Sequence, residues 1–571
     1  MTPAVHLDIG SGTSQNFLRA WQAWRANPHR PRLLHFAAVC GDTYLNTNID
    51  VTVEPLADAL DIQLWGLLPG FHRLTFEGGQ VLLTLCIGNM QSQLKQHAFQ
   101  ADSVFLDNLA SPGLDSLNTI KAIAKLCKRG STFTAAHKNS ELLASLRQCG
   151  FTSLPQDART NVLPNVLPNV LPSALPDVLQ ATYCPAWPVK PSHTASQPDS
   201  CIVIGSGLAG AAVASSLARR GWAVTVLDAA STPASGASSL PAGLLVPHTS
   251  PDDSALSRLS RAGVRMTLYQ ARAHLRHGID WGHTGVLQRD LTAGKAKLPC
   301  TWATSLWHAA SDWCYPASQK TLTAAGLPPD SHALWHVQAG WIKPASLVRA
   351  WLTTPGIAWR GNVNAAQLKP LAHGWQVLDA SGKLQAQANR VVLCAGYTSQ
   401  ALAKSAGIST PYLQPVRGQV TLGLQGDSTP MPPFAVNGHG NLLTAIPTPE
   451  GQAWLMGASY ERDAGMANIK PQDHTDNLAR LQLLLPHTAP TIEDQFSPLH
   501  ARGWAGIRCA TRQRMPVVAS ADSNTHPGLW LCTGMGSRGL SFAAICGELL
   551  AAQWHGEPLP VESQLAKAMG L

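Results

Sequence analysis

The fold of the second half of the chain is decided by the stretch CIVIGSGLAG, residues 201–210. Four apolar residues typical of a buried strand run directly into a glycine-rich turn, and an alanine-rich helical segment follows. In this turn, which also holds Ser206, Gly205 reverses the chain, Gly207 lets backbone N–H groups approach a pyrophosphate, and Gly210 lets helix and strand pack closely. The helix N-terminus favours phosphate charge. The stretch therefore predicts a dinucleotide site; a glycine turn without a ligand is the alternative.

Two further segments indicate FAD rather than NAD. The strand AVTVLD (223–228) ends in Asp228, whose carboxylate can accept hydrogen bonds from ribose hydroxyls. Near the end of the chain, residues 528–552 form a second strand, glycine turn and helix, and residues 390–400 form a third strand and turn. A late glycine turn of this kind places N–H groups and a helix dipole at the pyrimidine end of a flavin. The late turn contains Gly534, Gly536, Ser537, Arg538 and Gly539.

These glycine motifs resemble the glycine oxidase and D-amino-acid oxidase (DAO) superfamily of flavoproteins. The motifs are 205–210, Gly236-Ala237-Ser238 with 242–244, and 534–539. More specific segments resemble the family of bifunctional tRNA 5-methylaminomethyl-2-thiouridine biosynthesis proteins (the MnmC family), and the resemblance spans nearly the whole chain. These segments are 285–288, 340–345, 415–420, 456–460, 506–512 and 534–540.

The resemblance implies an α/β protein in which a truncated Rossmann-like methyltransferase domain precedes a DAO-type FAD domain with an inserted α+β substrate domain. It implies that the flavin domain acts on a tRNA wobble uridine, removes its carboxymethyl group as glyoxylate and leaves 5-aminomethyl-uridine. A methylation that uses S-adenosylmethionine (SAM) would follow. Two alternatives remain. One is a small-molecule amino-acid oxidase or dehydrogenase, and the other is a tRNA-binding protein whose first domain transfers no methyl group.

The candidate catalytic residue for binding the substrate carboxylate is Arg508, because a guanidinium binds a carboxylate with two parallel hydrogen bonds. An ion pair between Arg508 and an internal acid is the alternative. By resemblance, Arg417, Gly418 and Gln419 lie against the isoalloxazine ring, and Arg538 lies in the turn that faces it. Other candidates, each with an alternative structural role, are Arg512 and Arg514 for tRNA phosphates, Tyr460 for the pocket, and His283 beside Trp281.

The first block alternates strand-like and helix-like segments, as in a doubly wound α/β fold. The expected buried parallel strands are 34–39, 80–88 and 103–109, and expected helices include 17–26 and 117–127. Residues 7–18, LDIGSGTSQNFL, resemble the first glycine loop of a methyltransferase, but about sixty residues that precede this loop in the family are missing.

The methyltransferase resemblance breaks at the residues expected to hold SAM. Ser14 stands where the family has a glycine, Cys40 where it has the ribose-binding acid, and Asn89 where it has a second acid. Asp42 lies two positions after Cys40, and Asp107 is retained as a candidate catalytic residue. We therefore expect a degenerate site that methylates weakly or not at all.

Domain boundaries follow from the tandem repeat NVLP NVLP NVLP at 161–172. A proline at every fourth position excludes a regular helix and favours an extended linker. We expect domains at 1–155 and 199–571, joined by a proline-rich linker over 156–198.

Composition sets the remaining limits. The 571 residues carry a net charge of +8, which suits an anionic partner such as RNA, although charge alone fits a basic soluble enzyme better. The 12 cysteines form no C-x-x-C pair or Cys/His cluster, so no metal site and no disulfide framework are expected. With no signal-like start and no membrane-length apolar stretch, we expect a cytoplasmic protein.

Overall fold

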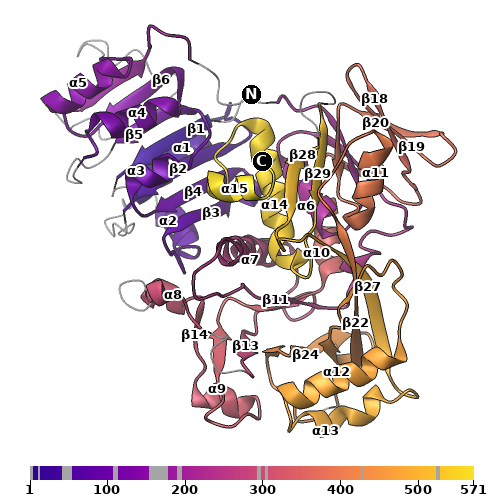
Figure 1. The fold of residues 1–571 in the computed structure, drawn as a ribbon. Helices are drawn as coiled ribbons and strands as arrows, with labels where there is room; N and C mark the ends of the chain where they lie inside the picture. The colour runs from indigo at the N-terminus through magenta and orange to yellow at the C-terminus, as the bar shows by residue number, and fades with distance from the viewer. Residues whose placement is uncertain are drawn as a thin grey trace. The chain divides into compact units, whose positions relative to one another are not determined.

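The chain divides into two compact units in the computed structural model (Figure 1). The first unit comprises Met1–Gln197 with Ala551–Leu565, and the second comprises Pro198–Leu550 with Ala566–Leu571. The structure describes residues 4–10, 13–41, 54–106, 113–153, 178–189, 196–291, 297–302, 307–426, 429–521 and 527–571.

The first unit contains an eight-stranded sheet in the order β3-β4-β2-β1-β5-β6-β8-β7. The central strands β4, β2, β1, β5 and β6 run parallel, while β3, β8 and β7 join in antiparallel pairs. Because β1 lies between β2 and β5, the direction of winding reverses there, and ligands of such sheets bind at the strand ends beside this point. The strands are β1 (Ala4–Ile9), β2 (Leu34–Cys40), β3 (Gly70–Phe76), β4 (Val81–Ile87), β5 (Ala101–Leu106), β6 (Cys127–Ala135), β7 (Phe151–Ser153) and β8 (Leu179–Tyr183).

Helices cover the sheet, and a separate apolar cluster lies on each of its faces. The predicted buried parallel strands are confirmed as β2, β4 and β5, except that residues 107–109 lie outside the described residues. The two predicted helices correspond to α1 and α4. The helices of this unit are α1 (Thr13–Ala26), α2 (Glu54–Asp61), α3 (Met90–Leu94), α4 (Leu117–Lys125) and α5 (Ser140–Gln148).

Strand β8 differs from the sequence expectation, because it falls inside the range assigned to the linker. It pairs with both β6 and β7, so the sheet of the first unit is not complete at residue 155. Leu179, Ala181 and Tyr183 alternate into the core, which is the period of a half-buried strand. The NVLP repeat at 161–172 lies outside the described residues.

The second unit is built on a six-stranded sheet in the order β17-β10-β9-β21-β29-β28, parallel except for β28. Helices α6, α7 and α14 pack closely through glycines. A Cβ on Gly547 of α14 would lie 2.7 Å from the Ala212 backbone of α6, and one on Gly263 of α7 would lie 1.6 Å from the Ser541 carbonyl. The elements are β9 (Ser200–Ile204), α6 (Leu208–Arg219), β10 (Ala223–Leu227), α7 (Ala255–His274), α10 (Pro344–Leu352), β17 (Ile357–Arg360), β21 (Arg390–Leu393), α11 (Ser399–Ser405), β28 (Val517–Ser520), β29 (Leu529–Thr533), α14 (Gly539–His555) and α15 (Ser563–Ala568). The end of α14 and the start of α15 fall within Ala551–Leu565, which belongs to the first unit.

A nine-stranded, mainly antiparallel sheet is the second large sheet of this unit, with α9, α12 and α13 beside it (Figure 1). Its core includes Trp454 stacked on Phe496. This is the predicted inserted α+β domain. Its elements are β13 (Val286–Arg289), α8 (Trp307–Ser311), β14 (Cys314–Pro316), α9 (Gln319–Ala324), β15 (Ala333–His336), β22 (Gln414–Leu424), β23 (Ala435–Gly438), β24 (Gly440–Thr448), β25 (Gly451–Gly457), β26 (Glu461–Arg462), α12 (Pro471–Leu484), α13 (Ala489–Ile492) and β27 (Arg502–Ala510).

Two small sheets complete the unit, in the orders β11-β16-β12 and β18-β19-β20. No helix among the described residues is long and apolar enough to cross a membrane. The small sheets consist of β11 (Gly243–Leu245), β12 (Trp281–Gly282), β16 (Gly340–Ile342), β18 (Gln367–Leu371), β19 (Gly374–Leu378) and β20 (Leu384–Ala388).

Candidate active site

The turn between β9 and α6 has the backbone geometry that its glycines predict. Gly205 has a φ of 103°, and a Cβ there would lie 2.7 Å from the Cys394 carbonyl oxygen. A Cβ on Gly210 would lie 1.8 Å from the carbonyl oxygen of Gly205. The predicted tight turn and the predicted close packing of helix on strand are therefore confirmed, because only glycine fits both positions.

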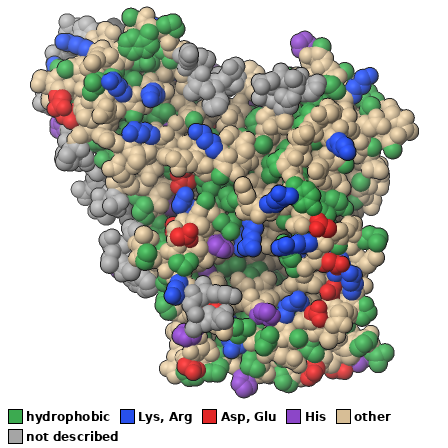
Figure 2. All heavy atoms as spheres, viewed as in Figure 1, with side chains coloured by type: hydrophobic (Ala, Val, Ile, Leu, Met, Phe, Trp, Pro, Cys, Tyr) green, Lys and Arg blue, Asp and Glu red, His purple; other side chains and the backbone are tan. Residues whose placement is uncertain are grey.

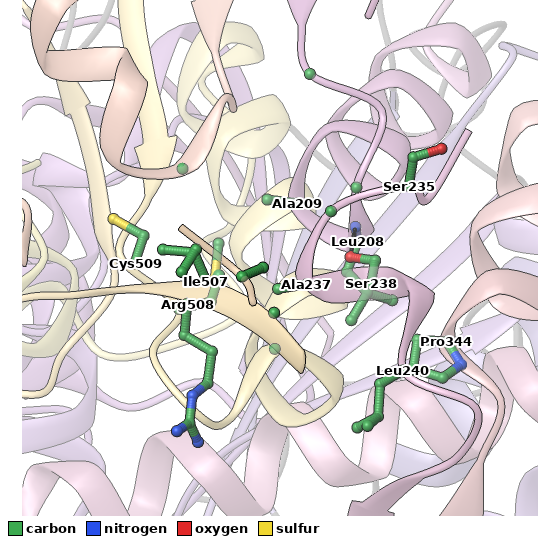
Figure 3. Close-up of a pocket in the computed structure, with 18 of the residues that line it drawn as sticks. Leu208, Ala209, Ser235, Ala237, Ser238, Leu240, Pro344, Ile507, Arg508 and Cys509 are labelled. Atoms are coloured by element: carbon green, nitrogen blue, oxygen red, sulfur yellow. Dashed lines mark hydrogen bonds between the residues drawn. The ribbon is translucent and has the colours of Figure 1, made fainter. Parts of the chain in front are cut away.

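The segment Gly236-Ala237-Ser238 reaches the N-terminus of α6. The Ser238 hydroxyl accepts a hydrogen bond of 3.0 Å from the backbone N–H of Leu208, in the first turn of this helix, and Figure 3 shows the two residues side by side. Gly207 is the N-cap residue of α6, and a Cβ on it would lie 3.1 Å from the Ser238 Oγ. The N–H groups at this helix end thus face a small hydroxyl, which an incoming phosphate oxygen can replace.

Asp228 also stabilises the glycine turn, a role that was not predicted from the sequence. One of its carboxylate oxygens accepts hydrogen bonds from the Ser206 N–H (2.6 Å) and the Ser206 hydroxyl (2.7 Å), and the other accepts from the Ala230 N–H (2.9 Å). The carboxylate therefore holds the glycine turn in place. Because a carboxylate offers about four acceptor positions, it also keeps acceptor capacity for a hydroxyl in the cavity that it lines.

A cavity of about 630 Å³ runs past these groups, and we call it the flavin cavity. Its lining includes Asp228 and residues 363–365 beside the glycine turn, and Gly418 with residues 504–509 from the strands β22 and β27. Figure 3 shows Ser235, Ser238 and Leu208 grouped on one side and Ile507, Arg508 and Cys509 on the other. Its volume falls within the range of about 300–1,000 Å³ that is usual for ligand sites.

Arg508 enters this cavity from β27 without an acidic partner. Its Nη2 donates a hydrogen bond of 3.0 Å to the Ser459 carbonyl, and its guanidinium carbon lies 5.3 Å from the Tyr460 ring centroid. Its Nε is buried and has no hydrogen-bond partner, and among the described residues no carboxylate pairs with it. Burial lowers the pKa of Arg508, while Tyr460 opposes this shift. The alternative of an internal ion pair is not observed.

Arg417 and Gln419 differ from the expectation that they lie against the flavin. The Arg417 guanidinium is buried against α12, where it pairs with Asp473 at 2.6 Å and donates to the Asn468 carbonyl. The Gln419 amide oxygen accepts from Arg417 (2.6 Å) and from the Lys470 N–H (2.7 Å). Side chains alternate along a strand, so only Gly418 and Val420 of β22 face the cavity.

The turn between β29 and α14 closes the far side of the flavin cavity. Gly534 and Gly536 have φ values of 76° and 57°, and a Cβ on Gly539 would lie 3.2 Å from Leu208. Gly534, Gly536, Ser537 and Gly539 line the cavity as expected. The Arg538 side chain instead lines a second, neighbouring cavity.

Two further candidates, Tyr460 and His283, are also placed by the structure. Tyr460 is 56% exposed and lines the second cavity, so it is not a core residue. His283 lines neither cavity, and burial lowers its pKa. The described residues contain no cluster of three or more His, Cys, Asp or Glu side chains that could hold a metal ion.

Comparison with known proteins decides the family. Residues 200–553 match the family model of FAD-dependent oxidoreductases (DAO), and residues 52–157 match that of S-adenosyl-L-methionine-dependent methyltransferases. The tRNA 5-methylaminomethyl-2-thiouridine biosynthesis bifunctional protein MnmC of Polaromonas naphthalenivorans is 48% identical over 99% of this chain and 89% of its own length. That of Verminephrobacter eiseniae is 44% identical over 99% of this chain and 95% of its own length.

The chain belongs to the MnmC family. Solved structures share the fold of its second unit. Glycine oxidase from Geobacillus kaustophilus has a TM-score of 0.52 at 18% identity and covers 65% of this chain and 97% of its own. L-proline dehydrogenase from P. horikoshii has a TM-score of 0.51 at 16% identity and covers 62% and 93%.

The second unit fits the FAD that its MnmC and DAO membership implies. Gly205 and Gly207 line the cavity at the N-terminus of α6, and the same cavity is lined by Gly418 and by Gly534, Gly536, Ser537 and Gly539. The cavity wall is mostly apolar, with backbone N–H groups and few charges, as a flat, weakly polar ring and a pyrophosphate require.

The first unit fits SAM poorly among the residues that are described. Cys40 at the end of β2 is buried, and its Sγ lies 3.7 Å from the Cys86 carbonyl oxygen. The Asn89 side chain accepts a hydrogen bond from the Ser92 N–H and caps α3, and the buried Ser14 hydroxyl has no hydrogen-bond partner. Asp42 and Asp107 lie outside the described residues.

Proposed function

We propose that the second unit uses FAD to oxidise the carboxymethylaminomethyl group of a tRNA wobble uridine, giving the aminomethyl-uridine and glyoxylate. The observation that carries this proposal is Arg508, a partly buried guanidinium at the wall of the flavin cavity that pairs with no carboxylate in the described part of the chain. A glycine-like carboxylate supplies the missing partner. The names of the MnmC relatives, which are tRNA biosynthesis proteins, support tRNA as the substrate.

The reaction needs one oxidation and one hydrolysis. The methylene carbon between the amine nitrogen and the carboxylate loses a hydride, and the nitrogen loses its proton, so an imine forms. Bound FAD supplies the hydride acceptor. Water then adds to the imine carbon, the carbon–nitrogen bond breaks, and glyoxylate leaves while the amine stays on the uridine.

The protein's own residues orient the substrate. Arg508 keeps four of its five N–H donors after its bond to Ser459, enough for a two-bond grip on a carboxylate. Fixing the carboxylate fixes the neighbouring methylene carbon in the cavity, and such positioning is a large part of catalysis. Gly418 and Gly506 lie opposite each other in β22 and β27 and line the cavity. Their lack of side chains leaves room for the Arg508 guanidinium beside Gly418 and for the Trp504 ring beside Gly506.

We also propose that FAD is held by the cavity-lining residues of three turns and of Gly418. The lining residues are Gly205, Gly207, Asp228, Gly236, Ala237, Ser238, Gly418, Gly534, Gly536, Ser537 and Gly539. Ser206 and Gly210 do not line the cavity and act indirectly, Ser206 through its hydrogen bonds to Asp228 and Gly210 through its close packing on the Gly205 carbonyl.

The test is nucleoside mass analysis of tRNA that carries the carboxymethylaminomethyl group, after incubation with the purified full chain. We expect this nucleoside to fall, the aminomethyl nucleoside to rise, and glyoxylate to appear in equal amount. Glyoxylate from free glycine, with no change in the tRNA, would instead establish a small-molecule amino-acid oxidase. Because tRNA is the substrate, we place the reaction in the cytoplasm.

For the first unit we propose weak or absent methyl transfer. A neutral Cys40 thiol is a poor acceptor for ribose hydroxyls, and one lost hydrogen bond to a buried hydroxyl costs about 0.5–1.5 kcal/mol. Calorimetric titration of SAM into the full chain measures this. Micromolar binding together with methylation of aminomethyl-uridine tRNA would overturn the proposal.

A further inference from the structure

A second cavity of about 700 Å³ adjoins the flavin cavity, and we call it the arginine cavity. Five arginines line it: Arg462, Arg508, Arg512, Arg514 and Arg538. They come from three separate regions of the second unit, at β26, along and after β27, and in the turn before α14. Figure 2 shows Lys and Arg side chains gathered near a hollow in the middle of one face of the molecule.

Among the described residues, the lining of the arginine cavity carries five cations and no carboxylate. Within the described part of the chain none of the five arginines forms an ion pair with a carboxylate. Asp463 already accepts hydrogen bonds from the Tyr412 hydroxyl and the Gln414 amide. Burial lowers the pKa of Arg538, and the nearby Arg514 cation adds to this effect. Gathered cations without counter-charges favour a ligand with several negative charges.

Two exposed tyrosines stand among these arginines. Tyr412 is 44% exposed, and the Arg512 guanidinium carbon lies 5.6 Å from its ring centroid. Tyr460 is 56% exposed, with Arg508 at 5.3 Å and Arg462 at 5.9 Å from its ring. Exposed aromatic rings interleaved with arginines are the usual means of binding unpaired nucleotides, because bases stack on rings and guanidinium planes while cations bind phosphates.

The two cavities share a wall. Arg508 and residues 534–537 line both, so a group bound in the flavin cavity is attached to a chain that must leave past the arginine cavity. The turn 511–514 presents Arg512 and Arg514 at this exit. It is closed by a hydrogen bond of 3.2 Å from the Arg514 N–H to the Thr511 carbonyl, and Arg514 has a φ of 58°.

We propose that the arginine cavity binds the single-stranded RNA backbone on either side of the target uridine, with Arg512 and Arg514 on phosphates and Tyr412 stacking a neighbouring base. This inference rests on the proposed function. A single substrate carboxylate needs only Arg508. The other four arginines and the two rings match a ligand that carries one charge per nucleotide and a flat base on each sugar.

The experiment compares the double variant Arg512→Ala/Arg514→Ala with the wild-type chain and with Lys369→Ala/Lys383→Ala. The control pair is exposed on the β18–β20 sheet and lines neither cavity, and it lowers the net charge by the same amount. Affinity for tRNA is measured at several salt concentrations. Turnover is measured on tRNA and on the free carboxymethylaminomethyl-uridine nucleoside, which has no phosphate.

We expect the arginine variant to bind tRNA roughly 10- to 100-fold more weakly and the control to bind like wild type. The slope of log affinity against log salt should fall by about 1.4, because each phosphate contact on a single strand contributes about 0.7. Turnover of the free nucleoside should not change. If the arginine variant binds tRNA with unchanged affinity and unchanged salt slope, the inference is wrong. The proposed function still holds in that case, provided that the wild-type chain is active on tRNA. Absence of wild-type activity on both substrates would overturn the proposed function instead.

A second comparison tests stacking apart from charge. Tyr412→Leu removes the ring, whereas Tyr412→Phe keeps the ring and removes only the hydroxyl that binds Asp463. Stacking of one base on a ring contributes about 1–3 kcal/mol, so Tyr412→Leu should weaken tRNA binding roughly 5- to 150-fold and Tyr412→Phe much less. If both variants bind tRNA as tightly as the wild-type chain, Tyr412 has no part in binding. If both lose the same affinity relative to wild type, the effect comes from the lost hydroxyl contact with Asp463.

Discussion

Replacement of Arg508 by lysine tests the proposed substrate carboxylate site directly. Arginine can grip a carboxylate with two parallel N–H bonds, whereas the ammonium of lysine is a single point donor on a flexible stem. After its bond to Ser459, Arg508 has four N–H donors left, including a buried Nε with no partner. The variant loses one charged hydrogen bond, worth about 1.5–3 kcal/mol, so kcat/KM should fall roughly 10- to 150-fold.

The same side chain can be displaced without changing its charge. A Cβ on Gly418 would lie 2.3 Å from the Arg508 Nη2 and 2.8 Å from its Cζ, so Gly418→Ala must push the guanidinium aside. The end of a flexible side chain can move, and we therefore expect this variant to fold. It should lose kcat/KM by an amount similar to Arg508→Lys.

The assay follows glyoxylate release, with flavin absorbance as the measure of FAD content. A parallel substrate carries a carboxamide in place of the carboxylate. On the carboxylate substrate both variants should be impaired when kcat/KM is expressed per bound flavin, and Arg508→Lys should keep near wild-type flavin content. On the carboxamide the difference from wild type should nearly vanish. If Arg508→Lys and Gly418→Ala both retain kcat/KM within about twofold, the carboxylate is held elsewhere and the proposed role of Arg508 is wrong.

Three further predictions follow from individual contacts. Gly210→Ala places a Cβ 1.8 Å from the Gly205 carbonyl oxygen and should abolish flavin absorbance, whereas Gly465→Ala, which meets no atom within 4 Å, should keep it. Arg417→Met leaves the largely buried Asp473 unpaired and should lower the free energy of unfolding by about 3–5 kcal/mol. Arg502→Met breaks the exposed pair with Glu450 and should change the free energy of unfolding far less, so equal losses in the two variants would contradict this prediction. Burial lowers the pKa of His336 to about 4, below the unfolded value of about 6.5, so the unfolded chain binds more protons and stability should fall by up to about 3 kcal/mol as pH drops through this window. Urea unfolding measures the free energy of unfolding of the wild-type chain and of His336→Gln between about pH 6.5 and 4. This free energy should depend less steeply on pH in the variant.

The parts of the fold that sequence predicted best are those fixed by local geometry. The strand, glycine turn and helix at 201–218 follow from residue types that allow almost no other backbone, and the structure gives Gly205 and Gly210 the positions expected. The parallel strands of the first unit were predictable because strands buried on both faces are continuous apolar runs. Strand β8 was missed because it follows a proline-rich segment, although its alternating Leu179, Ala181 and Tyr183 carried the signal.

Side-chain direction in β22 could not be predicted from its motif alone. Arg417, Gly418 and Gln419 are consecutive, and alternation requires that they divide between two faces. Which face meets the flavin depends on the pairing of β22 with β27 and on the position of α12, both set by distant parts of the chain. The useful signal was the glycine itself, because a side chain at position 418 would occupy the space of the Arg508 guanidinium beside the cavity.

The arginine cavity could not be predicted from the sequence either, because it forms from distant parts of the chain. Tyr412 and Arg462 are far from the 506–512 motif along the chain and lie beside it only in the folded unit. Its position has a consequence for substrate choice. Free glycine presents one carboxylate and can use Arg508 alone, whereas a uridine in a tRNA loop brings phosphates and bases to the other four arginines and the two tyrosines. The cations that attract RNA contribute little to the affinity for a small zwitterion, because they repel its ammonium group. The cavity therefore makes a small amino acid a poor competitor for the same flavin, without any group that excludes it by shape.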